Sequence, residues 1–284
     1  MNVLSFQSHV AYGHVGNSAA TFALQRLGID VWPVHTVLYS NHPGHGNFRG
    51  AAVAPAALAE IVDGLDAQGV LAECDAVLSG YLGEPGTAAV VADAVNRAKA
   101  QNPEALYCLD PVMGDEHGLY VDEAVPEAIA DSLLPLADIV TPNGFELAQL
   151  TGIAPAMLHD ALAGMQALWR AGPRLVVATS LAREDGPEDA VEAIALAADG
   201  AWSVAVPALG FGARPGGAGD LFAALFLAHC LKGSEAPAAL SLAASATWGV
   251  LRRTFDADAR ELLLVEAQDE LVAPEEMFDA RPVA

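Results

Sequence analysis

Short, mostly apolar runs of strand type alternate along the chain with longer stretches in which apolar residues recur at helical spacing. The pattern predicts strands over residues 3–7, 31–37, 76–79, 106–109, 138–141 and 175–178. It predicts helices over residues 16–27, 86–100, 123–133 and 155–171. Strands that alternate with helices build a mostly parallel sheet with helices on both faces. The predicted fold class is therefore α/β.

A hairpin is predicted after these units. Residues 190–197 and 202–206 are strand-like and are separated by Asp199-Gly200, a dipeptide that favours a tight turn. We expect an antiparallel edge there, followed by helices to the C-terminus, including one over residues 221–231. Because no repeat, linker or change in composition divides the sequence, we expect a single domain over residues 1–284.

The charge of the chain restricts its partners. Acidic residues outnumber basic ones by 36 to 13, which gives a formal net charge of −23. Such a surface repels nucleic acid and anionic membranes, so we expect neither as a partner. The first eight residues do not resemble a secretory signal, and no apolar run is long enough to span a membrane. Cys74, Cys108 and Cys230 suit reduced core thiols, so we expect a cytoplasmic globular protein.

A glycine-rich turn, Gly216-Gly217-Ala218-Gly219-Asp220, directly precedes the helix expected over residues 221–231. A helix N-terminus presents unpaired backbone N–H groups, and glycines let a phosphate approach them. Asp220 is placed to accept a proton from a hydroxyl that attacks a phosphoryl group. The alternative is a plain turn that ends in an N-cap aspartate. Since Lys99 and Lys232 lie elsewhere, backbone, metal or arginine must meet any phosphate charge.

Polar residues also follow the predicted parallel strands where each strand ends. Ligands of open α/β sheets bind at these carboxyl ends. Each residue alone also suits an N-cap, a turn or a satisfied core position. Together with the glycine-rich turn, the set indicates a ligand site. Its members are Ser8, Tyr81, Asp110, Asn143, Glu146, Thr179 and Ser180.

Five ordered motifs carry a resemblance to a known family. They are QSHVAYGHVGNS at 7–18, SNH at 40–42, SGY at 79–81, DPVMGD at 110–115, and TPN at 141–143 followed by Glu146. They resemble motifs of the pyridoxal kinases of the ribokinase superfamily, and they extend over essentially the whole chain. The resemblance implies a ribokinase-like, three-layer fold. It also implies an alcohol-group phosphotransferase that uses ATP to phosphorylate the 5'-hydroxymethyl group of pyridoxal, pyridoxine and pyridoxamine in vitamin B6 salvage.

The same resemblance implies roles for individual residues. Asp220 resembles the residue that acts as catalytic base in the family, and the backbone of Gly217, Ala218 and Gly219 resembles the segment that forms the anion hole. The implied substrate contacts are Ser8, His42, Pro43, Tyr81 and Asp220. The implied ATP contacts are Asp110, Asn143, Glu146, Thr179, Ser180, Ala213, Arg214, Pro215 and Gly216.

The resemblance further implies Mg²⁺ as the cofactor that accompanies ATP, with a monovalent cation as a further option. Asp110, Asp115 and Glu146 are similar to the acids that place the metal, directly or through water. Oxygen ligands suit Mg²⁺ better than the scattered histidines suit zinc. The loop over residues 39–50 is polar and glycine-rich, and it is either a lid or a plain surface loop. The resemblance also implies a homodimer, and an open sheet edge and this loop fit that implication.

Three positions depart from the family pattern. Ala218 stands where many members have threonine, and the missing hydroxyl removes a hydrogen bond worth about 1.5–3 kcal/mol to a charged group. Pro43 stands where threonine is frequent, and Thr179 where some bacterial members have lysine. Two alternatives therefore stay open. One is a kinase for a related hydroxymethyl heterocycle, such as hydroxymethylpyrimidine, and the other is a B6-vitamer or nucleotide-binding protein with weak or no turnover.

Overall fold

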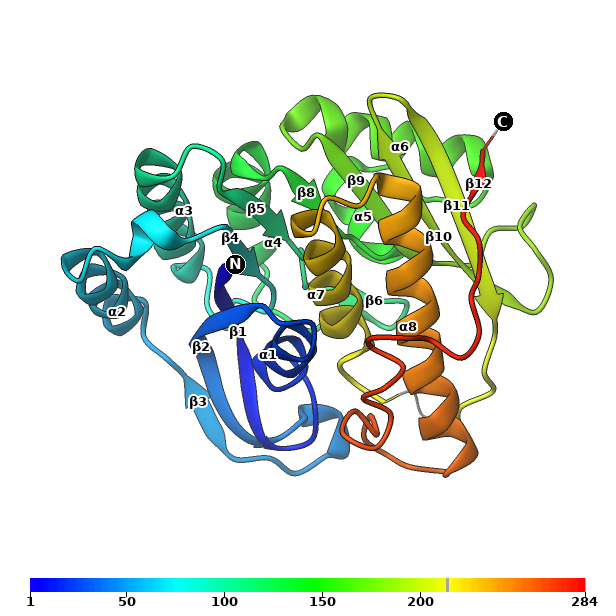
Figure 1. Ribbon diagram of the computed structural model, residues 1–284, viewed down its shortest axis with the longest axis horizontal. Helices are drawn as coiled ribbons and strands as arrows, with labels where there is room; N and C mark the ends of the chain where they lie inside the picture. Colours follow the sequence, from blue (N-terminus) through cyan, green and yellow to red (C-terminus); the bar gives the residue numbers. More distant parts are fainter. Residues whose placement is uncertain (213–214, 284) are drawn as a thin grey trace.

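One twisted sheet extends across the molecule (Figure 1). The structure, a computed structural model, describes residues 1–212 and 215–283. Within these residues ten strands join in the order β12-β11-β10-β9-β8-β5-β4-β1-β2-β3. The strands are β1 (Asn2–Tyr12), β2 (Asp30–Asn41), β3 (Gly50–Ala52), β4 (Ala76–Ser79), β5 (Leu106–Leu109), β8 (Ile139–Val140), β9 (Leu175–Leu181), β10 (Ala190–Ala197), β11 (Gly200–Pro207) and β12 (Arg281–Pro282). A separate small hairpin contains β6 (Gly114–Asp115) and β7 (Gly118–Leu119).

Helices cover both faces of the sheet and make a three-layer structure. They are α1 (Asn17–Arg26), α2 (Pro55–Ala67), α3 (Thr87–Gln101), α4 (Val125–Ala128), α5 (Gly144–Thr151), α6 (Leu158–Ala171), α7 (Ala218–Leu231) and α8 (Ala236–Asp256). Helices α1, α7 and α8 contribute to one apolar core, and α2, α3, α4 and α6 contribute to the other. In Figure 1 the first group lies on the near side of the sheet. None of the described helices combines the length and the apolar character that a membrane span requires.

The predicted α/β class and the antiparallel edge are confirmed. Strands β2, β1, β4, β5, β8 and β9 run parallel in that order, whereas β10 pairs antiparallel with both β9 and β11. The Asp199-Gly200 hairpin pairs Ala197 with Gly200. Successive residues of the central strands point to opposite cores, as Val3 and Leu4 of β1 do. Both faces are therefore apolar, which a sheet covered on both sides requires.

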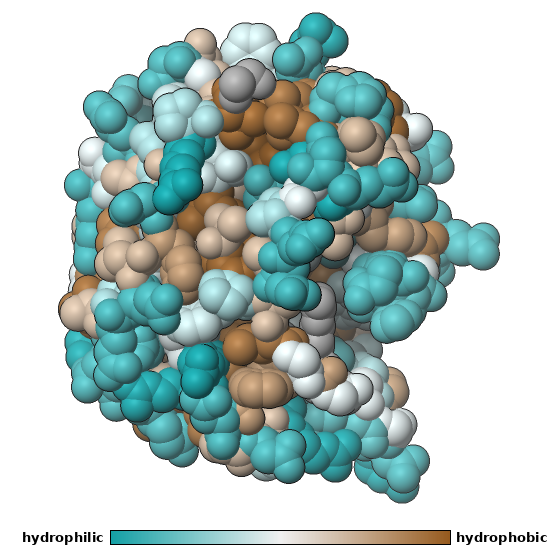
Figure 2. Space-filling view, turned by 90° about the vertical axis from the view of Figure 1, so that its right-hand side faces the viewer, coloured by the Kyte–Doolittle hydropathy of each residue, from teal (hydrophilic) through white to brown (hydrophobic). Residues whose placement is uncertain are grey.

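The prediction of helices up to the C-terminus is wrong after α8. Residues 257–280 form turns and bends, and β12 then pairs antiparallel with β11. The segment buries Leu262, Leu264 and Leu271 in the core to which α1, α7 and α8 contribute. These leucines fasten residues 257–280, called the strap below, to the three helices. Figure 2, which faces the β11–β12 side, shows apolar surface divided into separate areas by polar side chains.

Helix α7, which begins at the glycine-rich turn, is deeply buried. All residues over 221–228 are buried, and α7 packs between α1 and α8. A helix that is apolar all round has no face for solvent, so burial rather than amphipathic spacing fixes its place. Its N-terminal turn is consequently held beside the loop that joins β1 to α1.

Asn17, the first residue of α1, ties this loop to the sheet. Its Oδ1 accepts a hydrogen bond from Ser5 Oγ at 2.7 Å. Its Nδ2 donates to the carbonyl oxygens of Val34 at 3.1 Å, and of Ser5 and Gln7 at 3.3 Å each. Asn17 is buried, so no water replaces these bonds. One side chain therefore joins α1, β1 and β2.

We predict that Asn17→Ala lowers the free energy of unfolding by about 3 kcal/mol, because it leaves several buried partners unsatisfied. Urea denaturation followed by circular dichroism measures the change. Asn96→Ala is the matched control, since Asn96 is exposed on α3, and it should change stability by less than about 0.5 kcal/mol. Equal effects of both substitutions would show that the Asn17 network does not stabilise the fold.

Candidate active site

The polar residues predicted at strand ends lie side by side in the sheet. The backbone N–H of Asp110 donates to Ser79 O at 2.8 Å, and that of Thr179 donates to Pro142 O at 2.8 Å. Asn143 and Thr179 form a parallel bridge. Since β4, β5, β8 and β9 are neighbours, their carboxyl ends place these groups along one edge. This edge is the location that the sequence predicted for a ligand site.

The glycine-rich turn begins α7 next to this edge. Gly217 is the N-cap residue, with φ of 95°, a left-handed conformation that favours glycine. A Cβ at Gly217 would lie 1.9 Å from His14 O, so only glycine fits against that carbonyl. Among the described residues no side chain caps the helix. Pro215 is buried and Gly216 is partly buried, whereas the predicted Ala213 and Arg214 lie outside the described residues.

Asp220 lies on the first turn of α7 and is held by the β1–α1 loop. Burial raises the pKa of its carboxyl group, and hydrogen bonds from the backbone N–H groups of Gly16 and of Asp220 itself oppose that rise. These donors favour the charged carboxylate, which is the form that accepts a proton. Because Gly217 holds the N-cap position, Asp220 is not the N-cap residue of α7, and the alternative of a plain N-cap aspartate is wrong.

A second carboxyl group, that of Asp110, lies near Asp220. Asp110 is 5% exposed, and Thr141 Oγ1 donates a hydrogen bond to it at 3.1 Å. Burial and the charge of Asp220 raise the pKa of Asp110 to about 8. Burial and the charge of Asp110 also raise the pKa of Glu146. Carboxyl groups crowded in this way bind a cation favourably.

Glu146 uses both carboxyl oxygens on backbone donors. Oε1 accepts from Met113 N at 3.1 Å, and Oε2 accepts from Asn143 N at 2.8 Å. Asn143 Oδ1 in turn accepts from Glu146 N at 2.9 Å, which completes a capping box for α5. Asn143 Nδ2 also donates to Gly114 O at 2.8 Å. The structure thus makes Asn143 the N-cap residue of α5 and Glu146 its capping-box partner at N3, and together they fasten the segment 110–115 to α5.

The third predicted metal residue, Asp115, belongs to the β6–β7 hairpin. Its Oδ1 accepts from His117 N at 2.8 Å across the turn. Among the described residues no three His, Cys, Asp or Glu side chains converge closely enough to hold a metal ion. A metal at this edge would therefore complete its shell with water or ligand oxygens, as Mg²⁺ usually does.

Tyr120 was missed by the sequence reasoning. Burial of its hydroxyl group raises the pKa of that group, and so do the charges of Glu146, Asp110, Asp220 and Asp115, in that order. The residue as a whole is 52% exposed, so Tyr120 lies between these carboxylates and solvent. The turn-forming residues Glu116-His117-Gly118 could have predicted a hairpin here. This hairpin, formed by β6 and β7, directs the chain back to the site.

The predicted substrate residues lie at the β1, β2 and β4 end of the edge. Ser8 is buried, and a Cβ at Gly16 would lie 2.2 Å from its Oγ. Tyr81 is partly buried, and burial raises the pKa of its hydroxyl group. Thr179 is partly exposed, while Ser180 is exposed with φ of 53°.

The expected lid of residues 39–50 is mostly ordered structure. Strand β2 continues to Asn41, a 3-10 helix spans Pro43–His45, and β3 starts at Gly50. His42 caps the short helix, since its Nδ1 accepts from Gly44 N at 3.2 Å, while Pro43 is exposed. Burial lowers the pKa of His42. The lid is therefore a strand, a helical turn and a strand, rather than a free loop.

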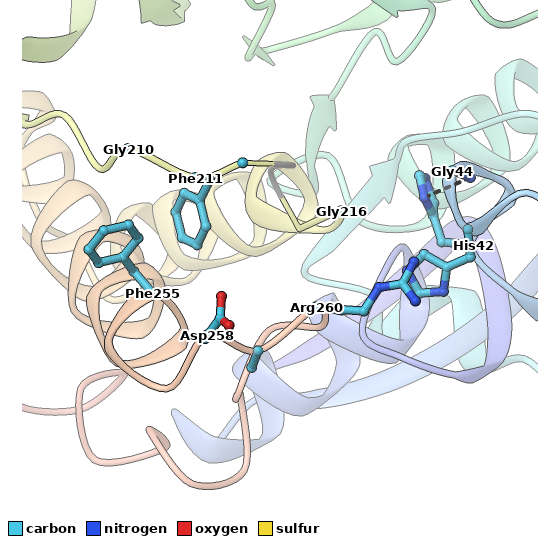
Figure 3. A pocket seen from close by; sticks show the side chains of 11 residues that line it. His42, Gly44, Gly210, Phe211, Gly216, Phe255, Asp258 and Arg260 are labelled. Carbon is cyan, nitrogen blue, oxygen red and sulfur yellow. Dashed lines mark hydrogen bonds between the residues drawn. The ribbon is translucent and has the colours of Figure 1, made fainter.

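A cavity of about 300 Å³ opens between the lid and the end of α8 (Figure 3). Phe211 and Phe255 meet edge to face at one end, 5.2 Å between ring centroids, and His42 lies at the other end. Its lining residues are His42, Gly44, His45, Gly210, Phe211, Gly212, Gly216, Phe255, Asp258, Ala259 and Arg260. His42 and Gly216 were predicted as site residues. The wall over 255–260 was missed because the sequence predicted helix there.

Comparisons with known proteins agree with this geometry. A family model described as phosphomethylpyrimidine kinase matches residues 51–263. A curated relative from Rubrobacter xylanophilus, named pyridoxal kinase PdxY, is 48% identical over 100% of this chain and 98% of its own. A second relative of the same name, from Deinococcus radiodurans, is 48% identical over 99% of this chain and 96% of its own.

Solved structures give the same answer for the fold. Pyridoxal kinase from Leishmania donovani, in complex with ADP and pyridoxamine, superposes with a TM-score of 0.93 at 31% identity. The match covers 100% of this chain and 99% of that one. The ribokinase-like fold is thereby confirmed. The chain belongs to the phosphomethylpyrimidine kinase family of the ribokinase superfamily, together with the pyridoxal kinases.

Proposed function

We propose that the protein transfers the γ-phosphoryl group of ATP to the 5'-hydroxymethyl group of pyridoxal, and of pyridoxine and pyridoxamine, in vitamin B6 salvage. The observation that carries the proposal is Asp220, which lies on the first turn of α7 with the backbone N–H of Gly16 facing its carboxyl group and the buried Asp110 nearby. The relatives named pyridoxal kinase extend over the whole chain, and the Leishmania donovani enzyme was solved with ADP and pyridoxamine, which supports this choice.

In this mechanism Asp220 accepts the proton of the substrate hydroxyl as its oxygen attacks the γ-phosphorus. The backbone N–H groups at the start of α7, from Gly217 to Gly219, donate to the phosphoryl oxygens. Phosphoryl transfer needs mainly positioning and stabilisation of charge, which a helix N-terminus supplies. Ser8, His42, Pro43 and Tyr81 are the proposed vitamer contacts, at the end of the edge next to the lid.

The nucleotide is proposed to extend from this edge into the cavity beside the lid. Phe211 and Phe255 offer aromatic surface for the adenine base. Asn143, Thr179, Ser180, Pro215 and Gly216 are the proposed contacts to the rest of ATP, together with Ala213 and Arg214, which lie outside the described residues. Asn143 would contribute by fixing the site, since its amide group is engaged with Glu146 and Gly114.

Mg²⁺ fits the cluster of Asp110, Glu146 and Asp220. The charge of Asp220 acts on Asp110 and the charge of Asp110 acts on Glu146, so a cation would relieve the repulsion between these carboxylates. Asp110 is proposed to hold the ion, and Asp115 and Glu146 to reach it through water, because both oxygens of Glu146 already accept backbone hydrogen bonds. When bound, the ion supplies positive charge to the phosphate oxygens. A monovalent cation remains a further option.

We further propose a cytoplasmic homodimer. Tyr12, Leu38 and Phe48 are large apolar residues that are exposed at the ends of β1 and β2 and on the lid. Exposed apolar groups at one end of a sheet favour association with a second copy. The edge strand β12 is a less suitable surface, because it has only two residues and includes Pro282.

A second candidate function is phosphorylation of a hydroxymethylpyrimidine. The matched family model is described as phosphomethylpyrimidine kinase, which names a related pyrimidine, and Pro43 removes a threonine hydroxyl that this family often has at the lid. A third candidate, a vitamer-binding protein with little turnover, draws on Ala218. A substrate panel separates the first two, and tight pyridoxal binding without turnover would favour the third.

We predict rapid formation of pyridoxal 5'-phosphate from pyridoxal, Mg²⁺ and ATP, followed by the absorbance of the aldehyde. Asp220→Asn should lower kcat by about a thousandfold, because the amide accepts no proton. Asp131→Asn, at an exposed acid, is the matched control and should leave kcat unchanged. An inactive parent protein, or turnover of the pyrimidine alone, would contradict the proposed substrate.

We predict that Ala218→Thr raises kcat by about tenfold, because the restored hydroxyl can donate one hydrogen bond to the transferring phosphoryl group. Ala218→Val is the matched control, since valine has the shape of threonine without its hydroxyl group. Steady-state kinetics with pyridoxal measures both variants. The idea fails if the two variants have the same kcat.

We predict that Mg²⁺ raises the melting temperature more at high pH than at low pH. The protonated form of Asp110 stabilises the metal-free fold at acid pH, and this contribution is lost as pH rises through about 8. Bound Mg²⁺ then compensates the carboxylates, and saturating ion should add about 3 °C near pH 9 and less near pH 6. Thermal denaturation of the parent and of Asp110→Asn, which should lose this difference, tests the assignment.

A further inference from the structure

Glu261 lies where the strap after α8 meets both the lid and the β1–α1 loop. Its side chain is 12% exposed. Oε1 lies 2.7 Å from Nε2 of His45 on the lid, and Oε2 accepts a hydrogen bond from His14 N at 3.3 Å. The two oxygens of one carboxylate therefore contact two segments that are separate in the sequence.

The loop is shaped for this contact. Gly13 has φ of 99°, which favours glycine, and a Cβ there would lie 2.0 Å from Glu261 Oε2, so the missing side chain leaves room for the carboxylate. Leu262, the next residue of the strap, is buried in the core and fixes the position of Glu261. The backbone of the loop thus leaves room for the Glu261 carboxylate, and the burial of Leu262 holds the backbone from which that carboxylate extends.

The same loop reaches the catalytic groups. The carbonyl of His14, whose N–H contacts Glu261, packs against Gly217 of the anion hole. Two residues further, the backbone N–H of Gly16 faces the carboxyl group of Asp220 and opposes the rise in its pKa. A displacement of this short loop would therefore move the anion hole and the donor to the base together.

The lid side of the contact borders the cavity. His42, Gly44 and His45 line it, and His45 also meets Tyr12 edge to face, with 6.3 Å between ring centroids. The charge of Glu261 opposes the fall in the pKa of His42 that burial causes. Glu261 is thus the acid that faces both lid histidines from the opposite wall.

We infer that Glu261 is a positioning residue that fastens the lid to the loop supporting Asp220, so that closure over the substrate and alignment of the base are set by one side chain. This inference rests on the proposed function for its kinetic consequence only. One oxygen holds the lid through His45, and the other holds the loop through His14 N–H. Removal of either contact therefore has a distinct effect.

Hydrogen exchange of the protein without substrate tests the structural part. In Glu261→Ala we expect about tenfold faster exchange at the hydrogen-bonded lid amides of His45 and Gly46, and also at the amide of His14. In His45→Ala only the lid amides should exchange faster. Glu266→Ala, at an exposed acid on the same strap, is the matched control and should change neither segment.

Kinetics with pyridoxal tests the functional part. His45→Ala should raise KM about tenfold with little change in kcat, whereas Glu261→Ala should raise KM and also lower kcat about tenfold. Glu261→Gln keeps the volume and can still accept from His14 N–H, so it should behave as His45→Ala does. This variant decides the question if Glu261→Ala does not fold.

Unchanged lid exchange in Glu261→Ala or in Glu261→Gln would overturn the inference, whatever the activity. Kinetic constants of the Glu261 variants that equal those of Glu266→Ala would overturn it as well. If the parent protein does not phosphorylate pyridoxal, the proposed function fails, and the exchange experiment still decides whether Glu261 holds the two segments together.

Discussion

The close approach of Gly217 to the carbonyl of His14 is the constraint on which the site depends. A side chain at Gly217 would collide with that carbonyl, so the start of α7 and the β1–α1 loop can meet only through glycine. Burial of residues 221–228 prevents α7 from sliding away, since each turn of the helix is packed between α1 and α8. The backbone N–H groups of the turn are consequently fixed before any ligand binds.

Repulsion between buried carboxylates destabilises the same edge of the sheet. Burial raises the pKa of Asp110, Glu146 and Asp220. The charge of Asp220 adds to the rise at Asp110, and the charge of Asp110 adds to the rise at Glu146. The formal net charge of the chain is also strongly negative. Such an arrangement costs free energy in the absence of a cation, and proteins keep it where a metal or a proton must bind. The N-terminus of α7 contributes positive potential on the other side of Asp220. Together they create a gradient of charge across the place where a phosphoryl group would pass.

The parts of the fold that are set by local pattern could be predicted from the sequence. The apolar runs at 76–79 and 106–109 became β4 and β5 with the same bounds, and Asp199-Gly200 formed the expected hairpin. The strand-end residues could be predicted to share an edge because parallel strands place their carboxyl ends together. The strap over 257–280 could not be predicted, since its apolar residues are spaced as in a helix. Where they pack depends on the core that α1, α7 and α8 form only in the complete fold.

The site shows the same division between local and long-range information. Asp220 and its glycines form a contiguous motif, whereas Tyr120, Phe255 and Glu261 become functional candidates only when distant segments meet. The strap that was mispredicted as helix is also the one that brings Glu261 to His14 and His45. If it had continued as a helix from α8, the side chain would have left the site, because a helix extends by about 1.5 Å per residue along its own axis. The turn at Ala257 and Asp258, where φ of Asp258 is 50°, reverses the chain instead. The end of α8 is therefore a requirement for the contact between the lid and the β1–α1 loop beside Asp220.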